Sequence, residues 1–486
     1  MYCIFMMWSE FFQLFSTNFI PFLVLLLASL AFNVRFSTSF ELDFPILYGS
    51  LSYFTFFFTI ATIYFFALDL SVFDHFLFFN QNIQLIFLFI MLSIIVVSRD
   101  YNINRLILKS EYDFLLVCVV LSAICLCFVD DFLVFYLVIE LQSLTFYVLA
   151  CFNRHSEFST ESGLKYFIFG GVISCFLLFG ICILYLTFGS TSFELVFSLL
   201  LLTNNAFYNV GIVFVLFALL FKVGSAPFHS WVCDVYDGVL LSVTLLFSAA
   251  PKLIIFSVII KLFFAFFNLT PFLTNLLVFS SILSIAIGTL SAFYQKRLKR
   301  LFAYSAIAHT GFILLGFLSC SVESSKSIII YLIIYALLTV LLFSLIIFSA
   351  LSTTNFPTYI ANFSSFGINN YHFALIFSLT LFSVAGIPPL AGFFSKFFVL
   401  LSAITGKFLV TSIVVVLISS AACFYYIRLI KIFFFVNDRK NNLWISNTNQ
   451  KTIEFIIGTF TFFNLIFFLQ PELLSNITTV LCFCLI

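Results

Sequence analysis

The stretch that decides the fold runs from Phe217 to Lys252 and reads FALLFKVGSAPFHSWVCDVYDGVLLSVTLLFSAAPK. Its first apolar run carries Lys222 deep inside it and breaks at residues 224–227, which read GSAP. After a short polar turn, a second apolar run carries Lys252 directly behind Pro251. A charge at the centre of a membrane helix costs about 2.5 to 3.5 kcal/mol, so an ionisable residue there indicates function. We therefore predict that both lysines carry protons.

The composition is that of a membrane protein. The 486 residues are 63% hydrophobic and 8% charged, with a mean hydropathy of +1.22, whereas a soluble domain has about a quarter of charged residues. The predicted fold is all-α and integral to the membrane. A net charge of +1 gives no sign of a nucleic-acid partner. The 12 cysteines form no CxxC pair or Cys/His cluster, so no metal site is expected. Residues 1–10 lack a basic segment, so no cleavable signal is expected and the N-terminus is predicted to be retained.

Apolar runs of about 20 residues, separated by polar breaks, predict about fourteen transmembrane helices. Two further runs, 194–203 and 475–486, are too short to span a membrane. The fourteen predicted spans are 17–34, 46–68, 82–98, 112–129, 132–152, 165–188, 207–223, 239–262, 272–293, 299–319, 327–350, 372–402, 408–434 and 453–470.

The basic residues predict the orientation. Fifteen lysines and arginines fall near loops after odd-numbered spans, and three, Lys261, Lys326 and Lys407, near loops after even-numbered spans. Under the positive-inside rule the odd loops face the cytoplasm, or the mitochondrial matrix, and both termini face the other side. A miscounted helix would have scrambled this asymmetry, so the asymmetry supports fourteen spans.

Two spans are interrupted by glycine and proline. The seventh ends at residues 224–227, and the twelfth contains 386–389, reading GIPP, followed by Gly392 and Lys396. Paired broken helices are the usual pointer to inverted repeats in a transporter. Lys222 and Lys396 each lie close to one of the breaks. We therefore expect broken helices seven and twelve within two inverted five-helix repeats, 111–262 and 263–435, flanked by three N-terminal helices in 1–110 and by a C-terminal helix and tail in 436–486.

Glu140 is the carboxylate expected to act with these amines. It lies in the middle of the fifth span. An opposite charge within a few ångströms keeps both a buried carboxylate and a buried ammonium ionised. Glu140 and Lys222 are therefore predicted partners, and a change in their separation would move a proton on or off Lys222. A static ion pair and a lysine that snorkels to the interface are the alternatives.

Other polar residues receive weaker predictions. The sequence separation of His309 from Glu140 is close to that of Lys396 from Lys222, so His309 is expected at the equivalent place in the second repeat. A hydrogen-bonded core histidine fits equally well. Tyr304 and Ser305 are expected to bridge gaps between the lysines. For Asp234 and Asp237 in the polar turn, capping of the following helix is preferred to proton uptake.

Three blocks resemble the antiporter-like proton-channel subunits of respiratory complex I, NADH:ubiquinone oxidoreductase. They are LLFKVGSAPFHSWVCDVYDG (219–238), KRLKRLFAYSAIAHTGFILLGF (296–317) and LFSVAGIPPLAGFFSKFFVL (381–400). Lys396 favours the chain 2 family, because chain 4 typically has glutamate at that place. The chain departs from the family at Cys233, where proline is common, and at Asp237, where glutamate is common.

This resemblance implies a function and its context. The family's proton-channel residues correspond to Glu140, Lys222, Lys252 and Lys396. The implied partners are other membrane-arm subunits, including neighbouring antiporter-like chains, and membrane lipids. The chain has no nucleotide-binding, haem or iron-sulfur motif, so FMN, iron-sulfur clusters and ubiquinone are expected in partner subunits. The mitochondrial inner membrane is the expected location, with a bacterial plasma membrane or a thylakoid as alternatives. An Mrp-type cation/proton antiporter and a non-catalytic scaffold are the alternative functions.

Overall fold

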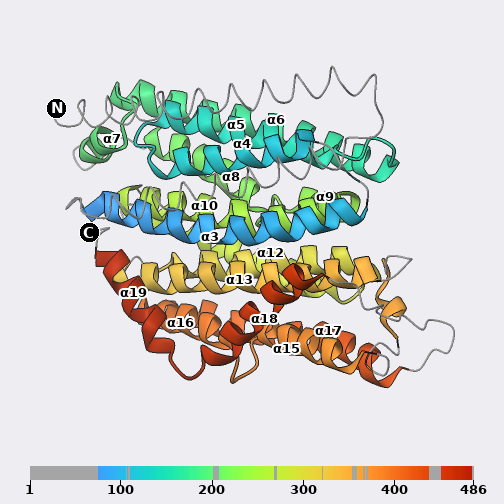
Figure 1. The fold of residues 1–486 in the computed structure, drawn as a ribbon. Coiled ribbons are helices and arrows are strands. Elements are labelled where there is room, and N and C mark those ends of the chain that lie inside the picture. Colours follow the sequence, from blue (N-terminus) through green and yellow to red (C-terminus); the bar gives the residue numbers. More distant parts are fainter. Residues whose placement is uncertain are drawn as a thin grey trace, which may run out of the picture.

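The computed structural model describes residues 75–483, apart from residues 106, 108–109, 201–206, 267–270, 320, 353–357, 365–366, 368–369 and 437–449. Within these residues it contains sixteen α-helices, one 3-10 helix and two isolated β-bridges, and no strand (Figure 1). The predicted all-α membrane class is confirmed. The first two predicted spans, 17–34 and 46–68, lie outside the described residues.

A helix coincides with every predicted span from the third to the eighth. The short run after the sixth span forms α7 (Phe193–Leu200), and α9 (Ser230–Gly238) follows the first break. The span helices are α3 (His75–Asn104), α4 (Ser110–Cys127), α5 (Phe132–Ala150), α6 (Glu157–Phe188), α8 (Phe207–Val223) and α10 (Leu241–Phe266).

The later spans likewise coincide with helices, and the twelfth is divided in two. A 3-10 helix, η2 (Ile360–Phe363), lies between the eleventh and twelfth spans, and α19 (Pro471–Phe483) follows the last one. The span helices are α11 (Pro271–Ala292), α12 (Leu298–Gly316), α13 (Val322–Ser352), α15 (Tyr371–Ala385), α16 (Ala391–Thr405), α17 (Leu409–Phe435) and α18 (Lys451–Ile466).

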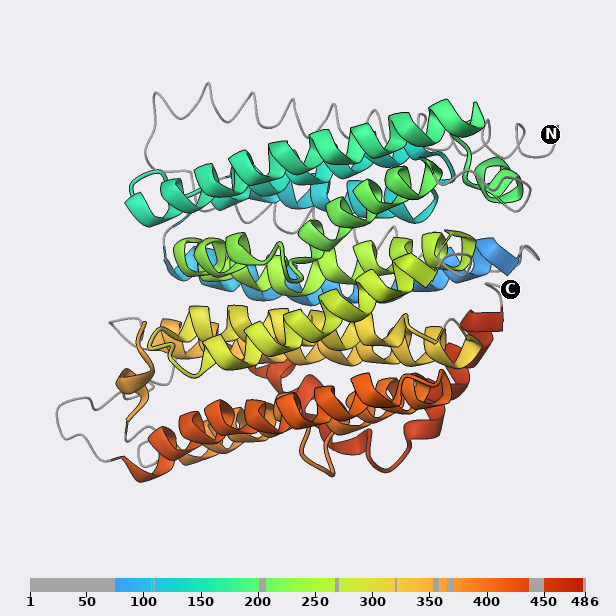
Figure 2. The same ribbon diagram turned by 180° about the vertical axis from the view of Figure 1, so that it is seen from behind.

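The long helices run roughly parallel and form successive layers. Helices α4, α5 and α6 lie at one side, α3 and α10 come next, α12 and α13 follow, and α15 to α17 lie at the far side (Figures 1 and 2). The most apolar stretch of α10 is 94% buried and that of α13 is 89% buried, against 28% in α17. Lysines on α10 are therefore enclosed by protein, whereas α17 presents most of its apolar surface outward, as a lipid-facing helix does.

Two helix breaks of similar geometry punctuate the bundle. In each, a helix ends at a glycine in the left-handed region, Gly224 with φ 79° and Gly386 with φ 87°, before the next helix begins. Each break also contains a cis prolyl bond, at Pro227 and at Pro389. A side chain is strained at such φ values, so glycine is favoured at both positions. The spacing from glycine to cis proline is the same in the two breaks.

Candidate functional site

Lys222 lies in the last turn of α8, immediately before the first break. Its Nζ atom is buried and has no hydrogen-bond partner among the described residues. The carbonyls of Leu220 and Phe221, one turn before the break, accept the backbone N–H groups of Gly224 and Ser225 and also two side-chain donors. Ser225 Oγ donates to Leu220 O at 3.0 Å, and Trp231 Nε1 donates to Phe221 O at 3.0 Å. Because neutral groups cap this helix end, the amine is left free for a mobile partner.

Glu140 is the nearest candidate for that partner. Its Oε1 atom is buried without a hydrogen-bond partner in the described part, while Ser143 Oγ donates to Oε2 at 3.3 Å. The carboxylate attracts Lys222 electrostatically, but the two groups form no ion pair within 4.0 Å among the ion pairs of the described residues. The structure therefore holds this pair apart, and it excludes a closed, static ion pair in this conformation.

A cavity joins Lys222 to Lys252. It lies between α5, α6, α8, α9 and α10, and Lys222 and Lys252 are both among its lining residues. Its other polar lining side chains are Gln142, Ser143, Tyr166, Trp231 and Tyr236. A cavity of about 20 Å³ with several polar groups is roomy enough for a water molecule. Two amines carried by successive apolar runs of the sequence thus share one compartment.

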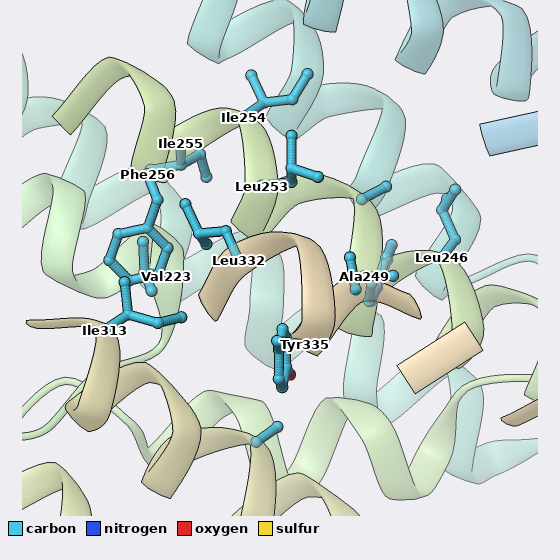
Figure 3. Close-up of a cluster of buried hydrophobic side chains, with 14 of the residues drawn as sticks. Val223, Leu246, Ala249, Leu253, Ile254, Ile255, Phe256, Ile313, Leu332 and Tyr335 are labelled. Carbon is cyan, nitrogen blue, oxygen red and sulfur yellow. The ribbon is translucent and has the colours of Figure 1, made fainter. Parts of the chain in front are cut away.

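Lys252 occupies the centre of the bundle and has only neutral partners. It is 4% exposed, and its Nζ atom donates to Tyr335 Oη at 2.9 Å and to Ala306 O at 3.2 Å. Apolar side chains of α8, α10, α12 and α13 form a buried cluster in the bundle that includes Tyr335 (Figure 3). The amine of Lys252 is therefore linked to α12 and α13, the helices of the second predicted repeat.

A second cavity continues from Tyr335. Its volume is about 30 Å³, and its lining includes His309, Tyr331, Tyr335, Ser305 and Ser383. His309 Nδ1 and Tyr331 Oη are hydrogen-bonded at 2.7 Å. These hydroxyl and imidazole groups can each accept and donate protons. Together with enclosed water they can extend a proton path beyond Lys252.

Lys396 lies on α16, just after the second break. Its Nζ atom donates to Val384 O at 3.1 Å and to Ala385 O at 2.6 Å, the last carbonyls of α15. It also lies 5.4 Å from the ring centre of Phe312. A cation is stabilised at a helix C-terminus by the helix dipole. Lys396 is thus held by the very carbonyls that the break releases.

The structure also places the residues of the two weaker predictions, His309 and Tyr304. Helices α5 and α12 are both 19 residues long, so their ends align His309 with Ser143, one turn beyond Glu140. The glycines of the two breaks align in the same way, but the lysines do not, since Lys222 precedes its break and Lys396 follows its own. Tyr304 faces Cys233 on α9 and is not among the lining residues of either cavity.

The aspartates of the polar turn do not cap α10. Asp237 Oδ2 lies 2.5 Å from Arg297 Nη1 and 2.9 Å from Arg300 Nε, and Asp234 Oδ2 lies 3.2 Å from Lys165 Nζ. The Asp237 carboxylate raises the pKa of Arg297 through hydrogen bonding. The capping prediction was wrong because three cations from α6 and from the start of α12 converge on these carboxylates.

The structure adds a buried lysine that sequence reasoning assigned to a loop. Lys261 is 7% exposed and donates to Cys127 O at the C-terminus of α4. Its ammonium opposes the raised pKa that burial gives Asp130 in the α4–α5 connection. The available signal was its position in the same unbroken apolar run as Lys252.

Comparison with known proteins identifies the family. Residues 129–424 match the model of the family described as NADH:quinone oxidoreductase/Mrp antiporter, transmembrane. The chain belongs to this family. It is 34% identical to NADH-ubiquinone oxidoreductase chain 2 of Marchantia polymorpha, over 94% of this chain and 96% of that protein. It is 36% identical to NADH-quinone oxidoreductase subunit N of Pelagibacter ubique, over 70% of this chain and 73% of that protein.

Its fold also matches that of a solved structure. A chain of respiratory complex I from Thermus thermophilus superposes with a TM-score of 0.74 and 23% identity, over 92% of this chain and 98% of that one. The resemblance predicted from the three sequence blocks is therefore confirmed. The family match contains Glu140, Lys222, Lys252 and Lys396, all within 129–424.

Proposed function

We propose that this antiporter-like family member is a proton-translocating membrane-arm subunit of respiratory complex I. Partner subunits pass electrons from NADH to ubiquinone, and this chain moves protons through intramembrane Glu and Lys residues. The observation that carries the proposal is the series of polar groups and two small cavities across the bundle. The first cavity holds Lys222 and Lys252, Tyr335 links Lys252 to the His309 cavity, and Lys396 donates to the carbonyl of Val384, a residue that lines this second cavity.

The separated Glu140 and Lys222 supply the step that drives transfer. An ammonium without a close carboxylate in a low-dielectric site loses the stabilisation of its charged form, and it regains that stabilisation when the carboxylate approaches. Approach of Glu140 therefore favours proton uptake on Lys222 from the basic side, which is the side of the membrane that carries most of the lysines and arginines. Withdrawal of Glu140 favours transfer through the shared cavity to Lys252 and onward to Lys396.

The finer organisation belongs to the same proposal. The chain has fourteen spans in two inverted five-helix repeats, 111–262 and 263–435, with three helices in 1–110 and one in 436–486. The two glycine-proline breaks of matching geometry support the repeats. The site residues include no metal or cofactor ligand, and FMN, iron-sulfur clusters and ubiquinone belong to partner subunits. The mitochondrial inner membrane is the proposed location, with neighbouring antiporter-like chains as partners.

Replacement of Lys222 by methionine in the assembled complex tests the function. The variant keeps the length of the side chain and removes its proton site, so the ratio of protons pumped per NADH oxidised should fall. Lys431→Met is the matched control, because Lys431 is exposed on α17 at the basic side. An unchanged ratio in Lys222→Met, with Lys431→Met behaving as wild type, would refute the scheme.

The Mrp-type cation/proton antiporter is the second candidate, because the family description covers it. The relatives cited above, at 34% and 36% identity, are complex I subunits by name, which favours complex I. Native electrophoresis separates the two. A complex I subunit migrates in an assembly that stains for NADH oxidation, whereas an antiporter subunit does not.

A further inference from the structure

Helix α9 forms a wall of the cavity that holds Lys222 and Lys252. Trp231, Val232 and Tyr236 on its inner face line that cavity, and all three side chains are buried. Figure 1 places α9 at the end of the bundle where α6 begins, which is the basic side of the chain. The short helix α9 thus stands between the lysine cavity and the compartment from which protons are taken up.

The inner face of α9 also supplies donors beside both lysines. Trp231 Nε1 donates to Phe221 O near the end of α8, which also accepts the backbone N–H of Gly224 at 2.9 Å. Tyr236 Oη donates at 3.1 Å to Phe247 O, which lacks its ordinary helical donor because the residue four positions later is Pro251. Each lysine-bearing helix therefore has one carbonyl that accepts a side-chain hydrogen bond from α9.

The outer face of α9 is held by charge. The charge clasp, as we name it here, is the set of five residues that join α9 to α6 and α12: Lys165, Asp234, Asp237, Arg297 and Arg300. The side chain of Asp237 is only 11% exposed. Exposed ion pairs contribute little, but enclosed pairs with two cations on one carboxylate are screened much less. The clasp therefore acts together with the buried packing of the inner face to hold α9 against α6 and α12.

We propose that α9 is a gate between the basic side and the lysine cavity, and that the charge clasp holds this gate shut. This inference rests on the proposed function. When the clasp opens, α9 withdraws the donors of Trp231 and Tyr236. Water from the basic side then reaches Phe221 O and Phe247 O, which leaves both amines in contact with the compartment that supplies protons.

The backbone around α9 suits such a movement. The helix is connected on one side through non-helical residues 224–229 and on the other through Val239 and Leu240, which precede α10. From Trp231 to Asp237 the helix rises by about 9 Å. If α9 moves as a rigid helix, a displacement at the clasp therefore also displaces the residues that line the lysine cavity.

Reversible crosslinking of the gate tests this proposal in the assembled complex. Asp237→Cys and Arg297→Cys together provide a thiol pair that a short bis-methanethiosulfonate can bridge. Bridging should lower proton pumping at least tenfold and leave NADH oxidation with ferricyanide unchanged, and a thiol reductant should restore pumping. Wild-type complex treated with the same reagent controls for the native cysteines. Pumping that persists in the bridged complex would overturn the gate.

Opening the gate gives a second, independent measurement. Val232→Cys should react slowly with a membrane-impermeant methanethiosulfonate added to inverted vesicles, and the added Asp237→Asn change should raise that rate at least fivefold. Glu157→Gln, at an exposed residue outside the clasp, should leave the rate unchanged. Equal rates with and without Asp237→Asn would refute the clasp.

The outcomes separate the gate from the function beneath it. If Lys222→Met abolishes pumping while crosslinking does not, the gate fails and the proton path stands. If Lys222→Met leaves pumping intact, the proposed function fails, whatever the labelling rates show.

Discussion

The two helix breaks have the same backbone and different chemistry. At the first, Ser225 and Trp231 add side-chain donors to Leu220 O and Phe221 O, which also accept backbone N–H groups, and the amine of Lys222 remains unpaired among the described residues. At the second, Lys396 itself caps the freed carbonyls of α15. Hydrogen bonds to a charged group contribute about 1.5 to 3 kcal/mol, whereas a buried polar group without a partner costs about as much. The amine at the first break therefore has no hydrogen-bond partner among the described residues, whereas the amine at the second break is fixed by two hydrogen bonds.

The largest expected contrast is in stability. Lys396→Met removes the donor of two buried carbonyls, so we expect a loss of about 2 kcal/mol in the free energy of unfolding. Lys222→Met removes an unpaired buried amine and should be neutral or stabilising by about 1 kcal/mol. The midpoint of SDS-induced unfolding measures both. Equal destabilisation by the two variants would erase the distinction between the breaks.

A double-mutant cycle sharpens the contrast at the glycines. A Cβ at residue 386 would lie 2.9 Å from Lys396 Cδ, and the left-handed backbone adds about 1 to 2 kcal/mol of strain. Gly386→Ala should therefore cost about 2 kcal/mol, of which about half is recovered in combination with Lys396→Ala, which removes the clashing atoms.

The first break provides the control for this cycle. A Cβ at residue 224 would lie 2.4 Å from Val232 Cγ2, and no atom of Lys222 is among its three nearest neighbours. Gly224→Ala and Lys222→Ala should then be additive within about 0.5 kcal/mol. Strong coupling at residue 224 in SDS unfolding would show that Lys222 is also fixed at its break.

Removal of the Trp231 indole should make the first break resemble the second, in that a lysine amine would donate to a carbonyl at the helix end. Trp231→Phe removes the indole donor of Phe221 O, which then keeps only the backbone N–H of Gly224, at a cost of about 1 kcal/mol. The free amine of the adjacent Lys222 is then the natural replacement donor, and its proton becomes harder to release. Proton pumping per NADH should fall severalfold in Trp231→Phe. A fall in stability without any change in pumping would limit Trp231 to a structural role.

The smallest expected effect concerns the hydrogen bond from Lys252 to Tyr335, which links the two predicted repeats. Tyr335→Phe removes an acceptor of the Lys252 amine and should slow turnover about threefold, close to the effect of one hydrogen bond of about 0.7 kcal/mol. Tyr304→Phe should leave turnover unchanged, because Tyr304 lines neither cavity. Equal rates in the two variants would place the path elsewhere.

The helices and their breaks follow from local sequence. The run of residues 207–223 predicts α8 with the same ends that the structure shows, because an apolar run and a following Gly-Pro pair determine where a membrane helix begins and stops. The placement of Lys222, Lys252 and Lys396 within apolar helices followed from the same runs.

The partners of those amines could not be predicted in this way. Tyr335 is distant from Lys252 in the sequence and meets it only because α10 and α13 pack together. The charges on Asp234 and Asp237 suggested a helix cap, because the sequence does not reveal that Arg297 folds back onto them. Lys261 was misassigned since a lysine near a span end is usually exposed, whereas here the end of α4 receives it.

The central position of Lys252 has an electrical consequence. Lys252 lies near the middle of the 26 residues of α10, so a proton on its amine has crossed roughly half of the insulating layer. Moving one elementary charge fully across costs about 2.3 kcal/mol per 100 mV of membrane potential. If Lys252 carries a proton as proposed, its occupancy is therefore voltage-dependent, with close to half of that work done when the proton arrives. A strongly energised membrane would then empty the site toward the side that carries most of the lysines and arginines.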